Sequence, residues 1–141
     1  MSLSGIAATQ ESIDLYEKKR FEKKEGGIIL KINENKIEVE HEFTEDFSGL
    51  LTTLPDEEPR YVLYDVPTKN QANLDDLKTV FMFWMPIESP VRLRMHYAST
   101  KSVVGNTFRG ISLTIQEDDK SVLNLDYLTT QLDKAKVMNR Y

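Results

Sequence analysis

The sequence contains no cysteine among its 141 residues. This absence excludes a disulfide framework, a cysteine-ligated zinc site and any chemistry that depends on a thiol. The chain must therefore be stabilised by a hydrophobic core, and its length is sufficient, because a domain of this size buries roughly 70% of the surface of its unfolded chain. With 40% hydrophobic and 29% charged residues, the composition is typical of a globular domain.

Long hydrophobic runs and an excess of positive charge are also absent. The longest apolar run, Val80–Met85, is far too short to span a bilayer, and the first residues lack the basic start and apolar run of a signal peptide. The formal net charge of −5 argues against general binding to nucleic acid or to an anionic membrane surface. We therefore expect a cytoplasmic protein with no membrane span and no nucleic-acid partner.

Signatures of catalysis are missing as well. The sequence has no spaced Ser/His/Asp set, no glycine loop that would cradle a phosphate and no pair of carboxylates at a catalytic spacing. The acidic runs around Asp75 and Asp118 lack the ligand spacing of a calcium loop. We expect no enzymatic activity, no metal and no cofactor.

Helix and strand patterns are intermixed along the chain, with no repeat, low-complexity tract or linker, so residues 1–141 are expected to form a single domain. Thr9 is expected to cap the first helix, which Gly26 and Gly27 would close. Ser89 followed by Pro90 is expected to start the longest helix. The predicted helices are 10–25, 45–54, 89–109 and 124–136, and the predicted strands are 27–32, 36–43, 60–66, 79–85 and 112–116.

Three strand patterns carry more detail. In 36–43, Ile37, Val39 and His41 alternate with glutamates, which indicates one wet face. The strands 60–66 and 79–85 are apolar nearly throughout, which is typical of central strands covered on both faces. The polar stretch between them, Pro67–Leu77, is predicted to be a loop. This arrangement indicates an α/β (α+β) domain with a mixed sheet sandwiched by helices.

The longest predicted helix is unusual in its charge. From Ser89 to Gly110 the segment has no acidic residue, although the chain as a whole is acidic. On a helical wheel a bulky apolar sector comprises Leu93, Tyr97, Val104 and Phe108, and a sector of smaller residues comprises Val91, Met95, Ala98, Ser102 and Gly105. Arg92 borders the second sector on one side, and Arg94 and Lys101 border it on the other.

A helix that lies on a sheet needs only one apolar stripe. The bulky sector is therefore predicted to face the core, and the smaller sector with basic borders is predicted to enter an apolar cleft with an acidic rim on a partner. From spacing alone a second interpretation stays open, in which both sectors are core and the basic residues are solvated borders.

Several stretches resemble the actin-depolymerising factor/cofilin family. They are "SGIA" from Ser4, "YVLYDV", and "VFMFWMPIESPVRLRMHYASTK", and the order of elements agrees from about Ser4 to Lys134. The most specific part is an aromatic-Trp pair, a proline, a spacer and then Pro-Val-Arg-x-Arg-Met-x-Tyr-Ala-Ser-x-Lys. The resemblance implies a five- to six-stranded mixed sheet flanked by helices, a monomeric actin-binding protein of the cytoskeleton, and a flexible N-terminal arm over about residues 1–8.

The resemblance also implies a site for the actin monomer. In the family the long helix enters the cleft between two actin subdomains, where Arg92 and Arg94 would pair with acidic groups and the thioether of Met95 would pack. The full implied set is Ser4, Gly5, Ile6, Arg92, Arg94, Met95, Ala98 and Lys101. Phosphorylation of the serine matched by Ser4 turns binding off in many relatives, because about two added negative charges repel an acidic partner. The alternative is that Ser4 is an unmodified tail residue.

The chain departs from the family at the second site, which in filament-severing members contacts the neighbouring actin subunit. Lys78 and Lys134 keep their basic character, but Asp76, Thr130 and Gln131 stand where the family has charged residues that bind the filament. An acidic residue facing an acidic filament reduces attraction. We therefore predict monomer binding, preferably to ADP-actin, with filament disassembly and poor stable filament decoration. Compensation by Lys69 or Lys136 is the alternative.

The same residues leave other functions open. A coactosin-like filament-side binder without depolymerising activity, a ligand of the branched-actin nucleation complex like glia maturation factor, and a small α/β enzyme remain alternatives. The basic cluster Lys18–Lys24 is compatible with phosphoinositide binding, but its interspersed glutamates favour a solvated helix end. His96 is expected to lie near Arg92 at the interface, where it would titrate.

Overall fold

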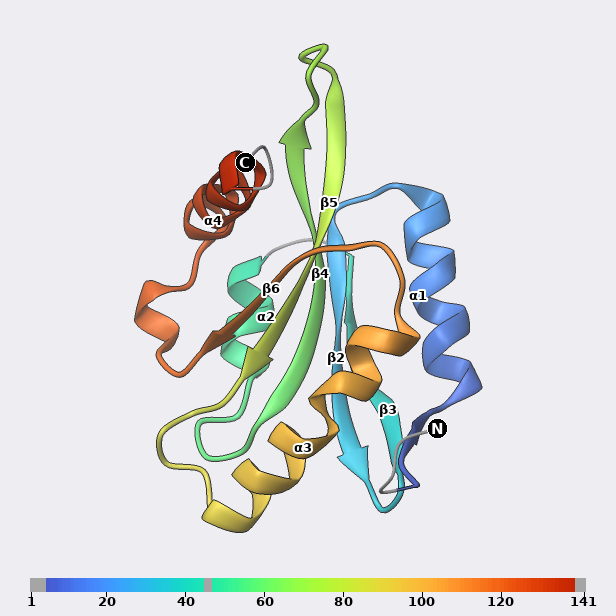
Figure 1. Ribbon diagram of the computed structural model, residues 1–141, viewed down its shortest axis with the longest axis vertical. Coiled ribbons are helices and arrows are strands. Elements are labelled where there is room, and N and C mark those ends of the chain that lie inside the picture. Colours follow the sequence, from blue (N-terminus) through green and yellow to red (C-terminus); the bar gives the residue numbers. More distant parts are fainter. Residues whose placement is uncertain (1–4, 45–46, 139–141) are drawn as a thin grey trace.

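The computed structural model describes residues 5–44 and 47–138, except for the side chains of the last three (Figure 1). The strands are β1 Ala7–Ala8, β2 Gly26–Asn33, β3 Lys36–Phe43, β4 Arg60–Lys69, β5 Asp75–Trp84 and β6 Ile111–Glu117. The helices are α1 Gln10–Glu22, α2 Phe47–Thr53, α3 Val91–Thr107 and α4 Leu125–Met138, with a short 3₁₀ turn, η1, at Lys120–Val122. Within the described residues no helix combines the length and the apolar character needed to cross a bilayer.

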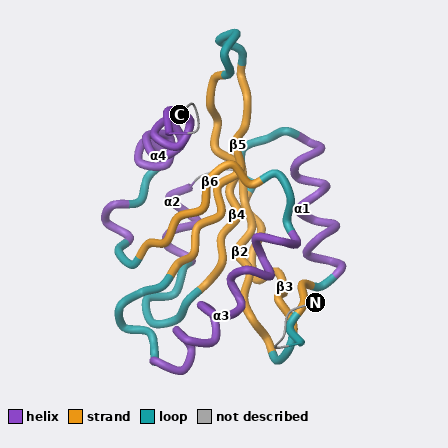
Figure 2. Tube along the Cα trace, viewed as in Figure 1, coloured by secondary structure: helices purple, strands orange, loops and turns teal. Residues whose placement is uncertain are grey.

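The six strands form one mixed sheet in the order β1-β3-β2-β4-β5-β6, with α1 and α3 on one face and α2 and α4 on the other (Figures 1 and 2). The two edge pairs, β1 with β3 and β5 with β6, are parallel, and the inner pairs are antiparallel. A parallel neighbour needs a crossover connection, and α3 supplies it between β5 and β6. The predicted mixed sheet between helix layers is confirmed.

The central strands are buried on both faces, as their apolar sequences predicted. Along β4, Tyr61 and Leu63 pack with α1 and α3, whereas Val62 and Tyr64 pack with α2 and α4. Because successive side chains of a strand point to opposite faces, a strand between two helix layers has no wet face and must be apolar at nearly every position.

The ends of α1 confirm one predicted cap and correct another. The hydroxyl of Thr9 accepts a hydrogen bond from the backbone N–H of Ser12 at 3.1 Å, as an N-cap should. The prediction that Gly26 and Gly27 close this helix was wrong, because α1 ends at Glu22 and Lys23 takes the left-handed conformation. Gly27 lies inside β2, where a Cβ would stand 2.6 Å from the carbonyl oxygen of Leu63, so strand packing explains this glycine.

The start of α3 also differs from the prediction. Pro90, not Ser89, occupies the N-cap position, no side chain caps the helix there, and Ser89 is buried. The helix ends at Thr107, two residues earlier than Arg109, with Phe108 as its C-cap. The proline fixes the entry of the chain into the helix, so the hydroxyl is not required as a cap.

The predicted loop Pro67–Leu77 is instead most of a long hairpin. The ladder of β4 and β5 continues to the pair Lys69–Asp75, and only residues 70–74 form the turn. The side-chain oxygen of Asn70 accepts hydrogen bonds from the N–H groups of Ala72 and Leu74, at 2.9 and 3.1 Å. The strands are polar here because the hairpin projects beyond the helix layers, as Figure 1 shows.

A β-bulge in β3 corrects the predicted position of His41. Ile29 pairs with His41 and Leu30 with Val39, so Glu40 is the extra residue. The bulge reverses the alternation: Ile37 and Val39 pack on the α1/α3 face, but His41 is exposed and lies beside Phe43 with ring centroids 6.1 Å apart.

Candidate interaction surface

The inner side of α3 is firmly packed on the sheet. Tyr97, Val104 and Phe108 are almost completely buried. The hydroxyl of Tyr97 accepts a hydrogen bond from the N–H of Ile32 at 2.9 Å, and the hydroxyl of Tyr61 donates to the carbonyl of Tyr97 at 2.5 Å. Burial raises the pKa of both tyrosines, so their hydroxyls stay protonated. These contacts fix both the position and the rotation of the helix.

The outer side of α3 is exposed, and its second half, at Ala98, Ser102 and Gly105, lines a hollow of about 310 Å³ beside Phe81 and Thr114 of the sheet. The side chains of Val91 and Met95 are 71% and 68% exposed, and Ala98, Ser102 and Gly105 are exposed as well. The two sectors of the helical wheel therefore lie on opposite sides, one in the core and one in solvent. The interpretation in which both sectors are core is wrong.

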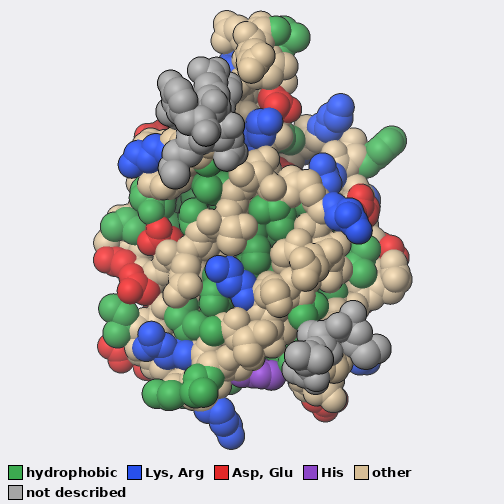
Figure 3. Space-filling model, in the orientation of Figure 1, with side chains coloured by type: hydrophobic (Ala, Val, Ile, Leu, Met, Phe, Trp, Pro, Cys, Tyr) green, Lys and Arg blue, Asp and Glu red, His purple; other side chains and the backbone are tan. Residues whose placement is uncertain are grey.

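Basic side chains border this exposed row. Arg92 and Arg94 are exposed, and the guanidinium of Arg94 lies 3.5 Å from the carbonyl oxygen of Ile87. Lys101 is half-buried, with its ammonium nitrogen 5.8 Å from the ring centroid of Phe83. Figure 3 shows hydrophobic and basic side chains together at the lower edge of the molecule, where α3 begins. We call the exposed side chains of Val91, Arg92, Arg94, Met95 and Ala98 the α3 outer face.

The N-terminal segment changes the expectation for one site residue. Ser4 lies outside the described residues, and Gly5 is exposed with a positive φ of 76°. Ile6, however, is only 2% exposed and packs in the core beneath α3, because β1 pairs with β3 directly after it. The predicted flexible arm is thus fixed from Ile6 onward. The side chain of Ile6 anchors this segment and cannot supply an apolar contact to a partner.

His96 lies near Arg92, as the helical wheel predicted. The two side chains line a cavity of about 470 Å³ between α3 and the β2–β3 turn. Glu34 and Glu58 line the same cavity from the other side. The basic border of the α3 outer face therefore has carboxylates of its own chain nearby on this side.

The two segments predicted for filament binding, the β4–β5 hairpin and α4, line a common groove. A groove of about 660 Å³ runs between the hairpin and α4, and Lys69, Lys78 and Asp133 are among its lining residues. Lys134 and Thr130 are exposed on α4, where the hydroxyl of Thr130 donates to the carbonyl of Asp126. The structure thus brings together the two segments that the resemblance assigned to a second site.

Both lysines of the hairpin are paired with carboxylates of the same hairpin. The ammonium of Lys78 lies 3.7 Å from a carboxylate oxygen of Asp76, and Lys69 forms an ion pair with Asp75. The hydrogen bond and the charge of Lys69 lower the pKa of Asp75, so this carboxylate stays ionised. The proposed compensation by Lys69 is weakened, because its charge is already offset; the side chain of Lys136 is outside the described residues.

Comparison with known proteins places this geometry in a family. The family model described as cofilin/tropomyosin-type actin-binding protein matches residues 5–133. Cofilin of Ogataea parapolymorpha is 34% identical over 139 residues, which cover 96% of this chain and 97% of that protein. The chain belongs to the cofilin family of actin-binding proteins.

Solved structures of the cofilin fold agree with this assignment. The crystal structure of Streptomyces griseoflavus cofilin superposes with a TM-score of 0.83 at 25% identity, over 92% of this chain and 98% of that one. Human coactosin-like protein superposes with a TM-score of 0.81, over 96% of this chain and 92% of that one, but at 12% identity this likeness shows the fold alone. Fold similarity therefore does not separate the cofilin branch from the coactosin branch.

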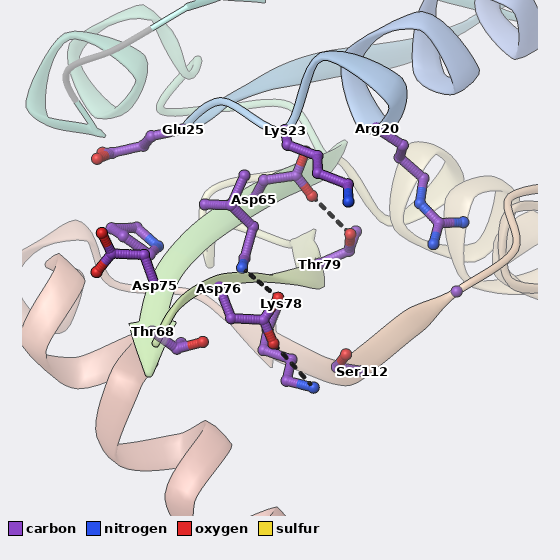
Figure 4. Close-up of a pocket in the computed structure, with 13 residues that line it drawn as sticks. Arg20, Lys23, Glu25, Asp65, Thr68, Asp75, Asp76, Lys78, Thr79 and Ser112 are labelled. Carbon is purple, nitrogen blue, oxygen red and sulfur yellow. Dashed lines mark hydrogen bonds and ion pairs between the residues drawn. The ribbon is translucent and has the colours of Figure 1, made fainter. Parts of the chain in front are cut away.

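A third groove, of about 720 Å³, lies between the end of α1 and the hairpin of this cofilin-family chain (Figure 4). Asp65 faces it and is only 7% exposed, and it accepts a hydrogen bond from the hydroxyl of Thr79 at 2.6 Å. Burial raises the pKa of Asp65, although Thr79 and the positive charge of Arg20 act in the opposite direction. Because Thr79, the residue paired with Asp65 on the adjacent strand β5, already binds this carboxylate, we assign Asp65 a structural role.

One exposed hydrophobic residue beside the α3 outer face was not predicted from the sequence. Ile87 is 67% exposed and lies in the turn between β5 and α3. Because Ile87 precedes the first residue of α3, the spacing of the helical wheel does not extend to it, and its neighbours in the sequence gave no signal; its link to α3 is the approach of Arg94 to its carbonyl oxygen. The prediction that the helix starts at Ser89 left Ile87 outside the helical wheel.

Proposed function

We propose that this protein binds actin monomers through the α3 outer face and promotes filament disassembly in the cytoplasm. One observation carries the proposal: α3 presents an apolar row to solvent between basic side chains, although Tyr97, Val104 and Phe108 on the opposite side of the same helix already pack in the core. A monomeric globular protein has no structural need for such a row, and exposed apolar patches of this kind are typical of interaction sites.

The proposed filament-side site is weak. Its lysines on the hairpin are paired with Asp75 and Asp76, so the hairpin offers little net positive charge to an acidic filament. This supports monomer capture with poor stable decoration of filaments. The family resemblance favours ADP-actin as the form of the monomer that is bound.

Co-sedimentation with preformed actin filaments tests both parts. We expect actin to move from the pellet to the supernatant while little of this protein pellets. Heavy co-pelleting without release of actin would refute the weak filament site. If neither protein changes its distribution, titration against labelled actin monomers decides, and absence of binding there would refute the actin function.

The substitution Asp76→Arg tests the filament-side argument directly. It removes the partner of Lys78 and adds a positive charge, so more of the variant should pellet with filaments. Asp118→Arg is the matched control, because it makes the same change of charge at an exposed position. Asp118 follows the C-terminal end of β6, whereas the N-terminal end of that strand lies nearer the hairpin. Equal pelleting of Asp76→Arg and wild type, or an equal gain in the control, would contradict the argument.

A coactosin-like filament-side binder is the second candidate, and the shared fold with human coactosin-like protein favours keeping it. Deletion of residues 1–5 discriminates, because the first residues belong to the proposed monomer site but not to a purely filament-side site. The deletion should stop before Ile6, since this side chain is buried in the core. Loss of monomer binding with unchanged folding would favour the cofilin-like function.

Two kinds of regulation are predicted for this protein, phosphorylation of Ser4 and binding of phosphoinositides. Phosphorylation of Ser4 concerns a residue outside the described part of the chain. For phosphoinositides, several groups of the Lys18–Lys24 cluster are already engaged: Lys19 donates to the carbonyl of Phe43, and Arg20 donates to the carbonyl of Arg109. These contacts favour a structural role for those two side chains.

A further inference from the structure

Exposed hydrophobic side chains are concentrated where α3 begins. In the described part of the chain six large hydrophobic side chains are exposed, and three of them, Ile87, Val91 and Met95, fall within one short segment. Single exposed hydrophobic residues are ordinary on a protein surface, but a cluster is not. Two members belong to the α3 outer face, and the third lies before the helix.

The turn that carries Ile87 is held in place on both sides. Pro86 and Ser89 are buried, and the N–H of Ser89 donates to the carbonyl of Pro86 at 3.1 Å. The guanidinium of Arg94, from the first turn of α3, approaches the carbonyl of Ile87. The fold therefore fixes the backbone around Ile87 while its side chain stays in solvent, so little order has to be gained when a partner covers it.

We infer that Ile87 is an additional actin-contact residue, which extends the apolar row of the α3 outer face beyond the N-terminus of the helix. This inference rests on the proposed function, and the occupant it commits to is the same actin monomer that covers Val91 and Met95. Ile87 is continuous with that surface, because it lies in the turn directly before α3 and Arg94 of the α3 outer face approaches its carbonyl oxygen, and its side chain is exposed as those of Val91 and Met95 are.

The contribution of Ile87 differs in kind from that of the arginines. Burial of an aliphatic side chain is not an interaction between charges, so its contribution should be nearly independent of salt. Attraction between Arg92 or Arg94 and acidic groups is screened, with a Debye length that falls to about 8 Å at physiological ionic strength. Ile87 should therefore supply the part of the affinity that persists when salt is added.

Titration of labelled actin monomers at about 50 mM and about 150 mM salt tests the inference. Truncation in Ile87→Ala should weaken binding about tenfold, and by the same factor at both salt concentrations. Ile87→Leu, which keeps the apolar volume, should bind nearly as wild type. The control is Leu74→Ala, because Leu74 is 63% exposed at the hairpin tip, at the opposite end of the molecule from the start of α3 (Figure 1), and should not change monomer binding.

The outcomes separate this inference from the function on which it rests. If wild type binds monomers and Ile87→Ala binds within twofold of it, the inference is overturned and the proposed function stands. The same holds if Leu74→Ala weakens binding as much as Ile87→Ala does. If wild type binds no monomers, the proposed function fails, and the inference fails with it. Thermal unfolding of each variant should match wild type, because both side chains are exposed.

Discussion

Replacement of Arg92 and Arg94 together by alanine should separate binding from folding. Both side chains are exposed, so the free energy of unfolding should change by no more than about 0.5 kcal/mol, which corresponds to a shift of about 2 °C in the Tm of a chain of this length. A charge-assisted hydrogen bond contributes about 1.5–3 kcal/mol. Loss of two such contacts with acidic groups on actin would cost about 3–6 kcal/mol, or roughly 10²- to 10⁴-fold in Kd.

The assay is a titration of labelled actin monomers, with thermal unfolding of the same samples. Lys18→Ala with Lys24→Ala is the matched control, because it removes the same charge from an exposed stretch at the end of α1. The control should bind as wild type, and the defect of the arginine variant should shrink as salt is added. A collapse of Tm would mean that the arginines are structural. Binding within a few-fold of wild type would mean that the α3 outer face does not meet actin.

Two substitutions test the structure away from the proposed contacts. Gly105→Ala should stabilise the protein by about 0.5–1 kcal/mol in denaturant unfolding, because an added Cβ meets no atom within 4 Å and alanine favours the helix interior; destabilisation would reveal an internal contact at this position. Asp65→Asn should raise Tm at neutral pH, since burial holds the folded-state pKa of Asp65 above its ordinary value of 3.8 and the folded protein binds this proton more tightly than the unfolded chain does. The wild type therefore regains stability relative to the variant as pH falls from the folded pKa toward 3.8, and a difference in Tm that does not shrink over this range would contradict the raised pKa.

Local patterns in the sequence predicted the parts of the fold that local physics decides. The unbroken apolar strands identified the centre of the sheet, and the two sectors of the α3 wheel separated the packed side from the exposed side. Each of these predictions depends on the period of the side chains along one element. Tyr97 and Met95 were assigned to opposite sides in this way, and the structure confirms both positions.

The errors arose where contacts between distant segments override the local pattern. Gly27 was predicted to end a helix, but it is needed where β2 passes close to β4. His41 changed faces because of a bulge, which inserts one residue without a local signal. Ile6 was matched to a flexible arm, yet pairing of β1 with β3 draws it into the core. The polar hairpin was predicted to be a loop because it lacks the apolar alternation of a strand. Beyond the helix layers the paired strands cover no core, so their sequence needs no apolar face.

The positions of the two proposed sites determine how the protein would act on a filament. The α3 outer face and the hairpin lie toward opposite ends of the molecule (Figure 1), so a strong contact at one does not require a contact at the other. On the hairpin, Asp75 and Asp76 offset the lysines, whereas the basic border of α3 has no acidic residue on the helix itself. Affinity for a single subunit can therefore exceed affinity for the junction of two subunits, and this inequality favours release of monomers over stable decoration of filaments. Asp76→Arg would reduce the inequality without touching α3, so it should raise filament binding while monomer affinity stays constant.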